Sequence, residues 1–171
     1  MAWLIIPAVS ALAAGVASAQ GGGPSDPQIA GIVVTANQID IDAGKLAKSR
    51  SKNKEIQAFA DQMITDHTAV NKQAVALANK LKVKPEDSDI SKSLKEGASK
   101  NTANLQKLSG AAFDKAYIDH EVAYHQAVLD AIDKVLIPGA KNDELKALIV
   151  KVRPAIASHL DHAKMIQGKV K

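Results

Sequence analysis

The chain has 171 residues, with 22 Lys and Arg against 18 Asp and Glu, a formal net charge of +4 and no cysteine. The lack of cysteine excludes disulfides, thiol catalysis and cysteine-based zinc sites. The basic residues form no dense run and aromatic residues make up only 3% of the chain, so we expect no nucleic-acid partner.

Residues 1–19 are small and apolar, and they end in an Ala-Ser-Ala sequence. This pattern is typical of a secretory signal peptide and predicts cleavage after Ala19, although no basic residue precedes the apolar stretch. The stretch is short for a membrane span. We therefore expect a periplasmic or secreted protein with no integral membrane span once the signal is removed. Residues 20–25 would form a flexible leader and residues 26–168 a single domain.

Apolar residues recur at helical spacing along the rest of the chain, and no strand-like alternation is present. Capping residues, glycine and proline divide the pattern into helices. The predicted helices cover about residues 26–50, 54–81, 89–108, 111–136 and 143–170. Pro138 and Gly139 are expected to end the fourth helix, Asn142 to cap the fifth, and Pro154 to kink it.

The segment 89–108 has fewer apolar residues than the others and lies between Pro85 and Gly110. We interpret it as an accessory helix, which leaves four main helices joined by short breaks. The expected fold is all-α, an up-down four-helix bundle with one additional short helix in the connection between the second and third bundle helices. The accessory helix also offers a surface for an envelope protein partner, although nothing in the sequence identifies one.

Three histidines, His67, His125 and His159, each lie at the centre of the apolar stripe of a different predicted helix. Counting residues from the interhelix breaks places them at similar heights, together with Asp40 of the first helix. Glu121 lies one turn before His125 on the same face. These five side chains are therefore expected to meet near the middle of the bundle.

Other polar residues lie near this cluster in the sequence. Tyr117 is one turn before the glutamate, and His162 lies at the margin of the last stripe, so we expect both to surround the cluster without joining it. His120 faces away from the stripe of its helix. Asp66 is next to His67 in the sequence and Asp161 is next to His162, so both aspartates are expected to point elsewhere.

Two interpretations of the cluster remain open. A buried hydrogen-bond network would pair the histidines with Asp40, Glu121, Tyr117 or water, because buried polar groups need partners. We prefer this interpretation, which makes the protein non-enzymatic, with a binding or structural role in the cell envelope or its stress response. Alternatively, the histidines would bind zinc, iron or copper with Asp40 or Glu121 as an oxygen ligand. The sequence contains neither a P-loop nor a G-x-S-x-G pattern, so no such motif indicates catalysis.

Three motifs carry a resemblance to a known family. They are FADQMITDH at residues 59–67, FDKAYI at residues 113–118 followed by His125, and HLDHA at residues 159–163. From about residue 26 to 166 the chain resembles the bacterial exported family of domain of unknown function 4142, often labelled predicted outer-membrane protein. The resemblance implies a ferritin-like four-helix bundle and no proven activity. The chain has no Glu-x-x-His motif of the kind that di-iron ferritin-like proteins use.

Overall fold

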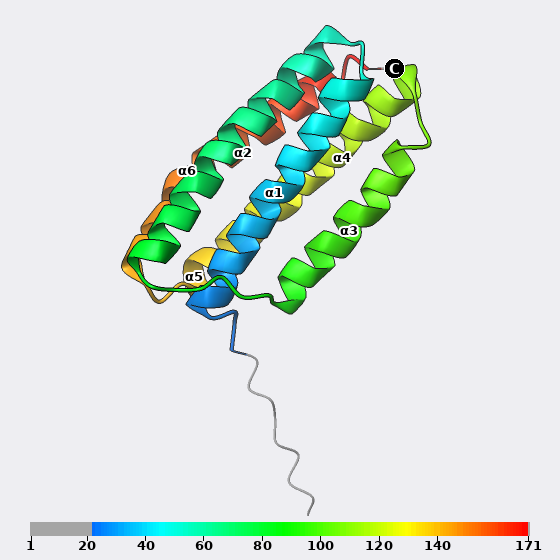
Figure 1. Ribbon diagram of the computed structural model, residues 1–171. Helices are drawn as coiled ribbons and strands as arrows, with labels where there is room; N and C mark the ends of the chain where they lie inside the picture. The colour runs from blue at the N-terminus through cyan, green and yellow to red at the C-terminus, as the bar shows by residue number, and fades with distance from the viewer. Residues whose placement is uncertain (1–21, 171) are drawn as a thin grey trace, which may run out of the picture.

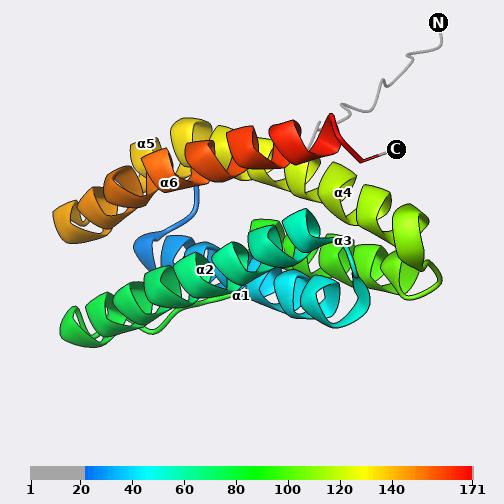
Figure 2. The same cartoon turned by 90° about the horizontal axis from the view of Figure 1, so that it is seen from above.

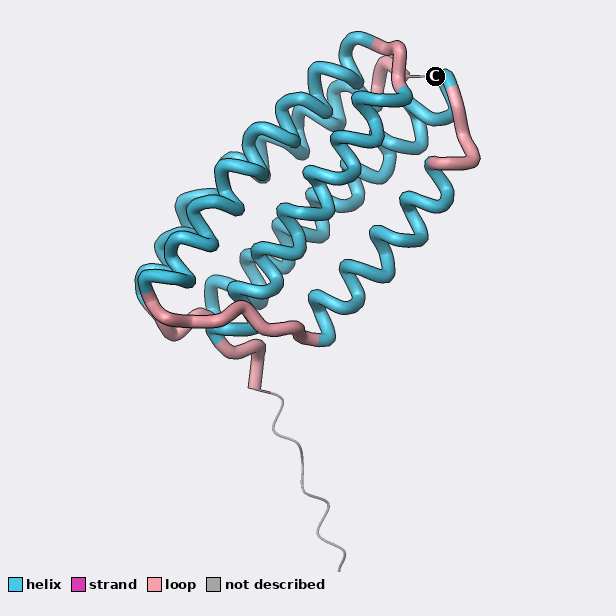
Figure 3. Tube along the Cα trace, in the orientation of Figure 1, coloured by secondary structure: helices cyan, strands magenta, loops and turns pink. Residues whose placement is uncertain are grey.

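The structure is a computed structural model, and it describes residues 22–170. The helices, in chain order, are α1 (Asp26–Arg50), α2 (Lys54–Lys80), α3 (Asp89–Leu105), α4 (Gly110–Ala131), the π-helix η1 (Ile132–Leu136), α5 (Ile137–Gly139) and α6 (Asp143–Gln167). Figure 3 shows that helices and loops account for this whole part of the chain, without a strand. The predicted all-α bundle is confirmed. The predicted signal peptide and the first two residues of the predicted leader lie outside the described residues.

The bundle has two layers, one made of α1 and α2 and the other of α4 and α6 (Figure 2). The helix α3 lies at the edge of the bundle beside α1 and α4 (Figure 1). It carries the chain back along the length of the bundle, so α2 and α4 run in the same direction while each layer is an antiparallel pair. The extra helix predicted between the second and third bundle helices is therefore present. Within residues 22–170, no helix combines the length and apolar character that crossing a membrane requires.

The helices begin at residues whose side chains satisfy free backbone N–H groups. Ser25, and not the neighbouring Asp26, caps α1 in a reciprocal capping box with Gln28. The carboxylate of Asp26 instead accepts hydrogen bonds from the backbone N–H groups of Lys141 and Asn142, at 2.8 and 2.9 Å. Asn142 caps α6, as predicted. One acidic residue thus joins the start of α1 to the start of α6.

The end of α4 differs from the expectation that Pro138 and Gly139 stop the helix. The chain passes directly from α4 into η1 and then into α5, which includes both residues. A proline in a regular helix clashes with the carbonyl group four residues earlier. The wider π-helical turn just before Pro138 relieves this clash, so the helical path continues to Gly139. Pro154 likewise lies inside a continuous α6.

The connection from α2 to α3 crosses α1 at Gly31. A Cβ atom at this position would lie 2.0 Å from the carbonyl oxygen of Glu86. The backbone N–H of Glu86 also donates a 2.9 Å hydrogen bond to the carbonyl of Pro27. Only glycine allows this close approach, which fixes where α3 begins.

The apolar core divides into two clusters along the bundle axis. The first contains Ile29 and Ile32 of α1 and continues through η1 and α6, and the second contains Phe59, Phe113 and Tyr117. Between them each main helix contributes buried polar residues at mid-length. These residues are Asn37, Asp40, His67, Glu121, His125 and His159. The candidate site is this polar layer.

Candidate metal centre

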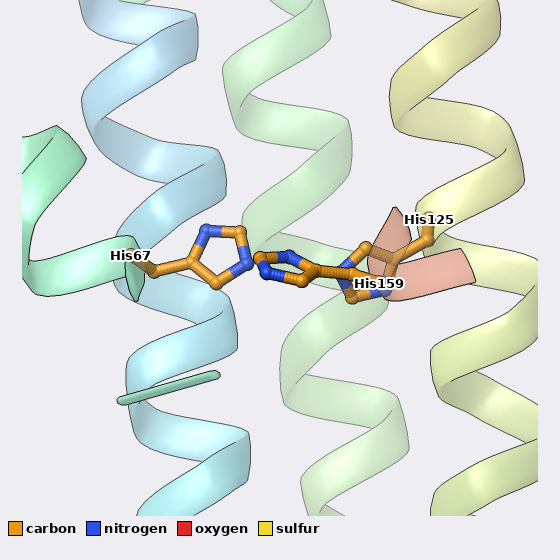
Figure 4. A group of neighbouring side chains, drawn as sticks. All are labelled: His67, His125 and His159. Atoms are coloured by element: carbon orange, nitrogen blue, oxygen red, sulfur yellow. The ribbon is translucent and has the colours of Figure 1, made fainter. Parts of the chain in front are cut away.

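His67 of α2, His125 of α4 and His159 of α6 point toward one another at the middle of the bundle (Figure 4). Their ring centroids are 5.2 to 5.8 Å apart, and each side chain is at most 3% exposed. The predicted convergence of three helices at one height is therefore confirmed.

The ring of His67 is held by an asparagine on α1. Asn37 donates from Nδ2 to the carbonyl oxygen of Val33 at 2.7 Å, which turns its amide oxygen toward the imidazole. Nδ1 of His67 lies 2.8 Å from this oxygen. An amide oxygen only accepts, so Nδ1 carries the proton and Nε2 keeps a lone pair. Asn37 was not among the predicted site residues, although a polar residue three positions before Asp40 on an apolar stripe was a signal for it.

His125 and His159 are held in the same manner by acceptors. Nδ1 of His125 lies 2.9 Å from the backbone carbonyl oxygen of Glu121, and Nε2 of His159 lies 2.9 Å from Oδ2 of Asp66. Each of these nitrogens therefore donates, which leaves a lone pair on Nε2 of His125 and on Nδ1 of His159.

The expectation that Asp66 points elsewhere is wrong. Asp66 is about 100° around α2 from its neighbour His67, and this direction faces α6 at the rim of the interface. Its side chain is 44% exposed and still reaches His159. Asp161 is exposed, in agreement with its expected orientation.

The three remaining ring nitrogens face a shared space. Nε2 of His67, Nε2 of His125 and Nδ1 of His159 are buried and have no hydrogen-bond partner among residues 22–170. One ligand nitrogen from each ring lies within 4.8 Å of the others. A tetrahedral zinc ion with Zn–N bonds of about 2.0–2.1 Å separates its nitrogens by about 3.4 Å. Such an ion would draw the three rings closer together.

Two carboxyl groups complete the polar layer. Oδ2 of Asp40 lies 3.4 Å from Nε2 of His67, and Oε2 of Glu121 lies 3.5 Å from Nδ1 of His125. Asp40, Glu121 and His125 form a second buried group with ligand atoms within 4.8 Å of one another. The two carboxyls lie close to each other, so a charge on one of them opposes the ionisation of the other.

Burial shifts the pKa of every carboxyl and histidine in this layer in the direction that favours the neutral form. It raises the pKa of Asp40 to about 7, and burial together with the nearby Asp40 charge raises the pKa of Glu121 well above its usual value. Burial, reinforced by the neighbouring imidazoles, lowers the pKa of His67 to about 3. It likewise lowers the pKa of His125 to about 4 and that of His159. The histidines are neutral at physiological pH, the form in which imidazole binds metals.

Tyr117 and His162 lie around the cluster at different distances from it. The Tyr117 hydroxyl is buried beside Glu121, and burial raises its pKa well above the usual value. Nδ1 of His162 lies 3.0 Å from the side-chain oxygen of Gln62, and its ring packs against Phe59. Tyr117 thus contacts the carboxyl side of the layer, whereas His162 is held outside it.

The protein is a helical bundle with a buried layer of three histidines and two carboxyls, a set that suits a metal ion. Residues 11–166 match the family described as Domain of unknown function (DUF4142), and the chain belongs to this family. The family resemblance drawn from the sequence motifs is confirmed. No curated protein and no solved structure matches the chain.

Proposed function

We propose that this protein binds one divalent transition-metal ion at the centre of its bundle. The ligands are Nε2 of His67, Nε2 of His125 and Nδ1 of His159, with the Asp40 carboxylate as the fourth. A single observation carries the proposal: each ring has one nitrogen bonded to a protein acceptor, while its other nitrogen is buried without a partner. Three lone pairs that share one space attract a cation.

The surroundings of the rings support this assignment. Histidine ligands of metals usually donate their second N–H to a carboxylate or a carbonyl oxygen, which fixes the tautomer and makes the ligating nitrogen more basic. Asp66, the Glu121 carbonyl and Asn37 supply such acceptors for His159, His125 and His67. The chain has no thiolate to offer, so the donor set is nitrogen and oxygen, which suits zinc, copper and iron.

The purely structural network preferred from the sequence alone explains these contacts less well. Each buried acceptor that is left without a donor lowers the free energy of unfolding by about 1–3 kcal/mol. The carboxyl groups of Asp40 and Glu121 offer at most one O–H donor each, so they leave at least one of the three histidine nitrogens without a donor. A bound metal ion satisfies all three nitrogens together.

Metal binding or buffering outside the cytoplasm, without catalysis, is the activity we propose. The export that it presupposes is inferred from the apolar stretch at residues 1–19. A link to envelope stress remains a prediction from the sequence.

The first experiment is metal analysis of the mature chain, purified without a histidine tag. Zinc, copper and iron contents are measured by mass spectrometry, followed by titration of the chelator-treated protein with Zn²⁺. We expect one equivalent of metal per chain in the wild type and none in His125→Gln. His120→Gln is the matched control, because His120 lies on the same helix outside the cluster.

The outcome separates the two interpretations. Loss of binding in His125→Gln with retention in His120→Gln supports the metal centre. A folded wild-type protein that takes up neither Zn²⁺, Cu²⁺ nor Fe²⁺ contradicts it and leaves the histidines a structural role.

A further inference from the structure

A cavity of about 90 Å³ lies in the bundle interior directly beside the polar layer. His67 and Asp40 are part of its wall, and almost all of the remaining surface is aliphatic. Ile132 of η1 and Val152 of α6 belong to this aliphatic wall. The cavity is therefore an apolar chamber whose wall includes two of the four proposed metal ligands.

One of the two helices behind the cavity departs from regular α-helical structure at this level, and the other contains a proline. The chain of α4 widens into the π-helix at Ile132, and α6 contains Pro154 between the cavity residues Val152 and Ile156. Protein interiors are close-packed, and an unfilled apolar cavity destabilises a fold. Single π-helical turns occur mostly at functional sites. The π-helical turn and the cavity coincide, which indicates a space kept for an occupant.

The helix α3 covers the cavity on its outer side. Ile90 and Leu94 are the α3 residues in its wall, and both are only partly buried. Of the 17 residues of α3, only Ser91 and Leu105 are buried. The outer wall of the cavity is therefore its least tightly packed side.

Size and chemistry define the occupant. A dry cavity of about 150 Å³ lined by aliphatic side chains holds benzene, so about 90 Å³ accommodates roughly four non-hydrogen atoms. We propose that the cavity binds a small apolar molecule of this size, such as dioxygen or a short hydrocarbon, against His67. The chamber needs no metal ion to form, so this proposal is independent of metal binding.

The test uses xenon, a probe of suitable size, on the chelator-treated full-length mature protein. Crystals are pressurised with xenon, and the histidine side-chain NMR signals are followed in solution as the xenon pressure rises. We expect one xenon atom between Ile132 and Val152 and a saturable shift of the His67 ring signals. Xenon absent from the cavity, or present without a response from His67, contradicts the proposal.

Filling variants make the test specific. Val152→Phe is expected to abolish the shift by occupying the cavity, and Val150→Phe is the control, because Val150 is 49% exposed on the same helix. If Val152→Phe does not fold, Ala36→Leu fills the chamber from α1. An unchanged xenon response in a folded filling variant contradicts the proposal. Competition by dioxygen or by n-butane identifies the class of occupant, and a failure of both to compete overturns it.

Discussion

Asp66 lies at the rim of the histidine cluster and acts on it through His159. Its carboxylate accepts a hydrogen bond from the Nε2–H of that ring and so directs the lone pair on Nδ1 toward the other two histidines. Carboxylates in this position tune metal ligands, and their loss typically weakens metal binding by about 10–100-fold. We expect Asp66→Ala to weaken Zn²⁺ binding by about this factor. Asp66→Asn should have a smaller effect, because the amide oxygen still accepts.

A competition titration against a chromophoric zinc chelator measures this effect. Asp61→Ala serves as the control. Asp61 lies on the exposed surface of the same helix as Asp66, where it pairs with Lys48 of α1. Since Asp66 is 44% exposed, its removal should leave the fold intact, which circular dichroism checks. Equal affinities in Asp66→Ala and Asp61→Ala would contradict the assigned role of Asp66.

Asp40 imposes a pH dependence on the metal-free protein. Burial raises its pKa in the folded state to about 7 from 3.8. The unfolded chain therefore releases this proton first as pH rises, and folded-state stability is lost between about pH 4 and 7. Asp40→Asn removes this titration, and its amide can donate to the free nitrogen of His67. We expect the variant to be more stable than wild type at neutral pH and to lose this advantage toward about pH 4.

Urea unfolding in the presence of a chelator measures the difference at several pH values. Asp42→Asn is the matched control, since Asp42 lies on the exposed side of the same helix. If the stability difference between Asp40→Asn and wild type were constant across this pH range, Asp40 would not be the group responsible for the pH dependence.

At the scale of the elements, α3 is the least firmly held of the long helices. Only two of its 17 residues are buried, and one of them, Leu105, anchors its end in the second core cluster. Helices with few buried contacts open locally at a small fraction of the global unfolding free energy. We expect the backbone amides of α3 to exchange with deuterium much faster than those of α1 in native-state exchange. Equal protection of the two helices would show that α3 unfolds only with the whole bundle.

The helix boundaries could be predicted from the sequence because local signals determine them. The first two predicted helices, 26–50 and 54–81, agree with α1 and α2 to within one residue. The accessory helix ends at Leu105, three residues before the expected boundary. The π-helix could not be predicted, because it carries no periodic signature and depends on how Ile132 and Leu136 pack in the core.

At the scale of the whole molecule, the level of the site was predictable and its contacts were not. Residue counts from the interhelix breaks placed His67, His125 and His159 at one height, since a helix rises by a fixed distance per residue. The pairing of Asp66 with His159 depends on how α2 and α6 are rotated against each other, which side-chain packing determines. The cavity likewise results from packing across α1, α4 and α6, so no single segment of sequence encodes it.

Zinc should protect the whole bundle in a manner that depends on pH. The pKa of His67 falls from about 6.5 in the unfolded chain to about 3 in the fold, and that of His125 to about 4. The unfolded state therefore binds these protons first, so the stability they contribute is complete above about pH 6.5 and is lost as pH falls toward the folded-state values. Protons compete with the metal for the same nitrogens in the unfolded chain and, at lower pH, in the fold.

With free Zn²⁺ at about 100 times its Kd, the folded state gains about 2.7 kcal/mol, which raises Tm by roughly 5–10 °C in a protein of this size. Scanning calorimetry from about pH 7.5 to about pH 4 should show this increase at the upper end. The increase should decline below about pH 7, as the proposed ligand Asp40 takes up a proton in the fold, and further toward about pH 4, as His125 does. The triple variant His67→Gln, His125→Gln and His159→Gln should lack both the zinc effect and the histidine-dependent loss of stability in acid. Its metal-free form should instead become more stable as pH falls from about 7 to about 5, because the titration of Asp40 and Glu121 then acts unopposed. A triple variant with the wild-type acid profile would exclude these imidazoles as the groups that titrate.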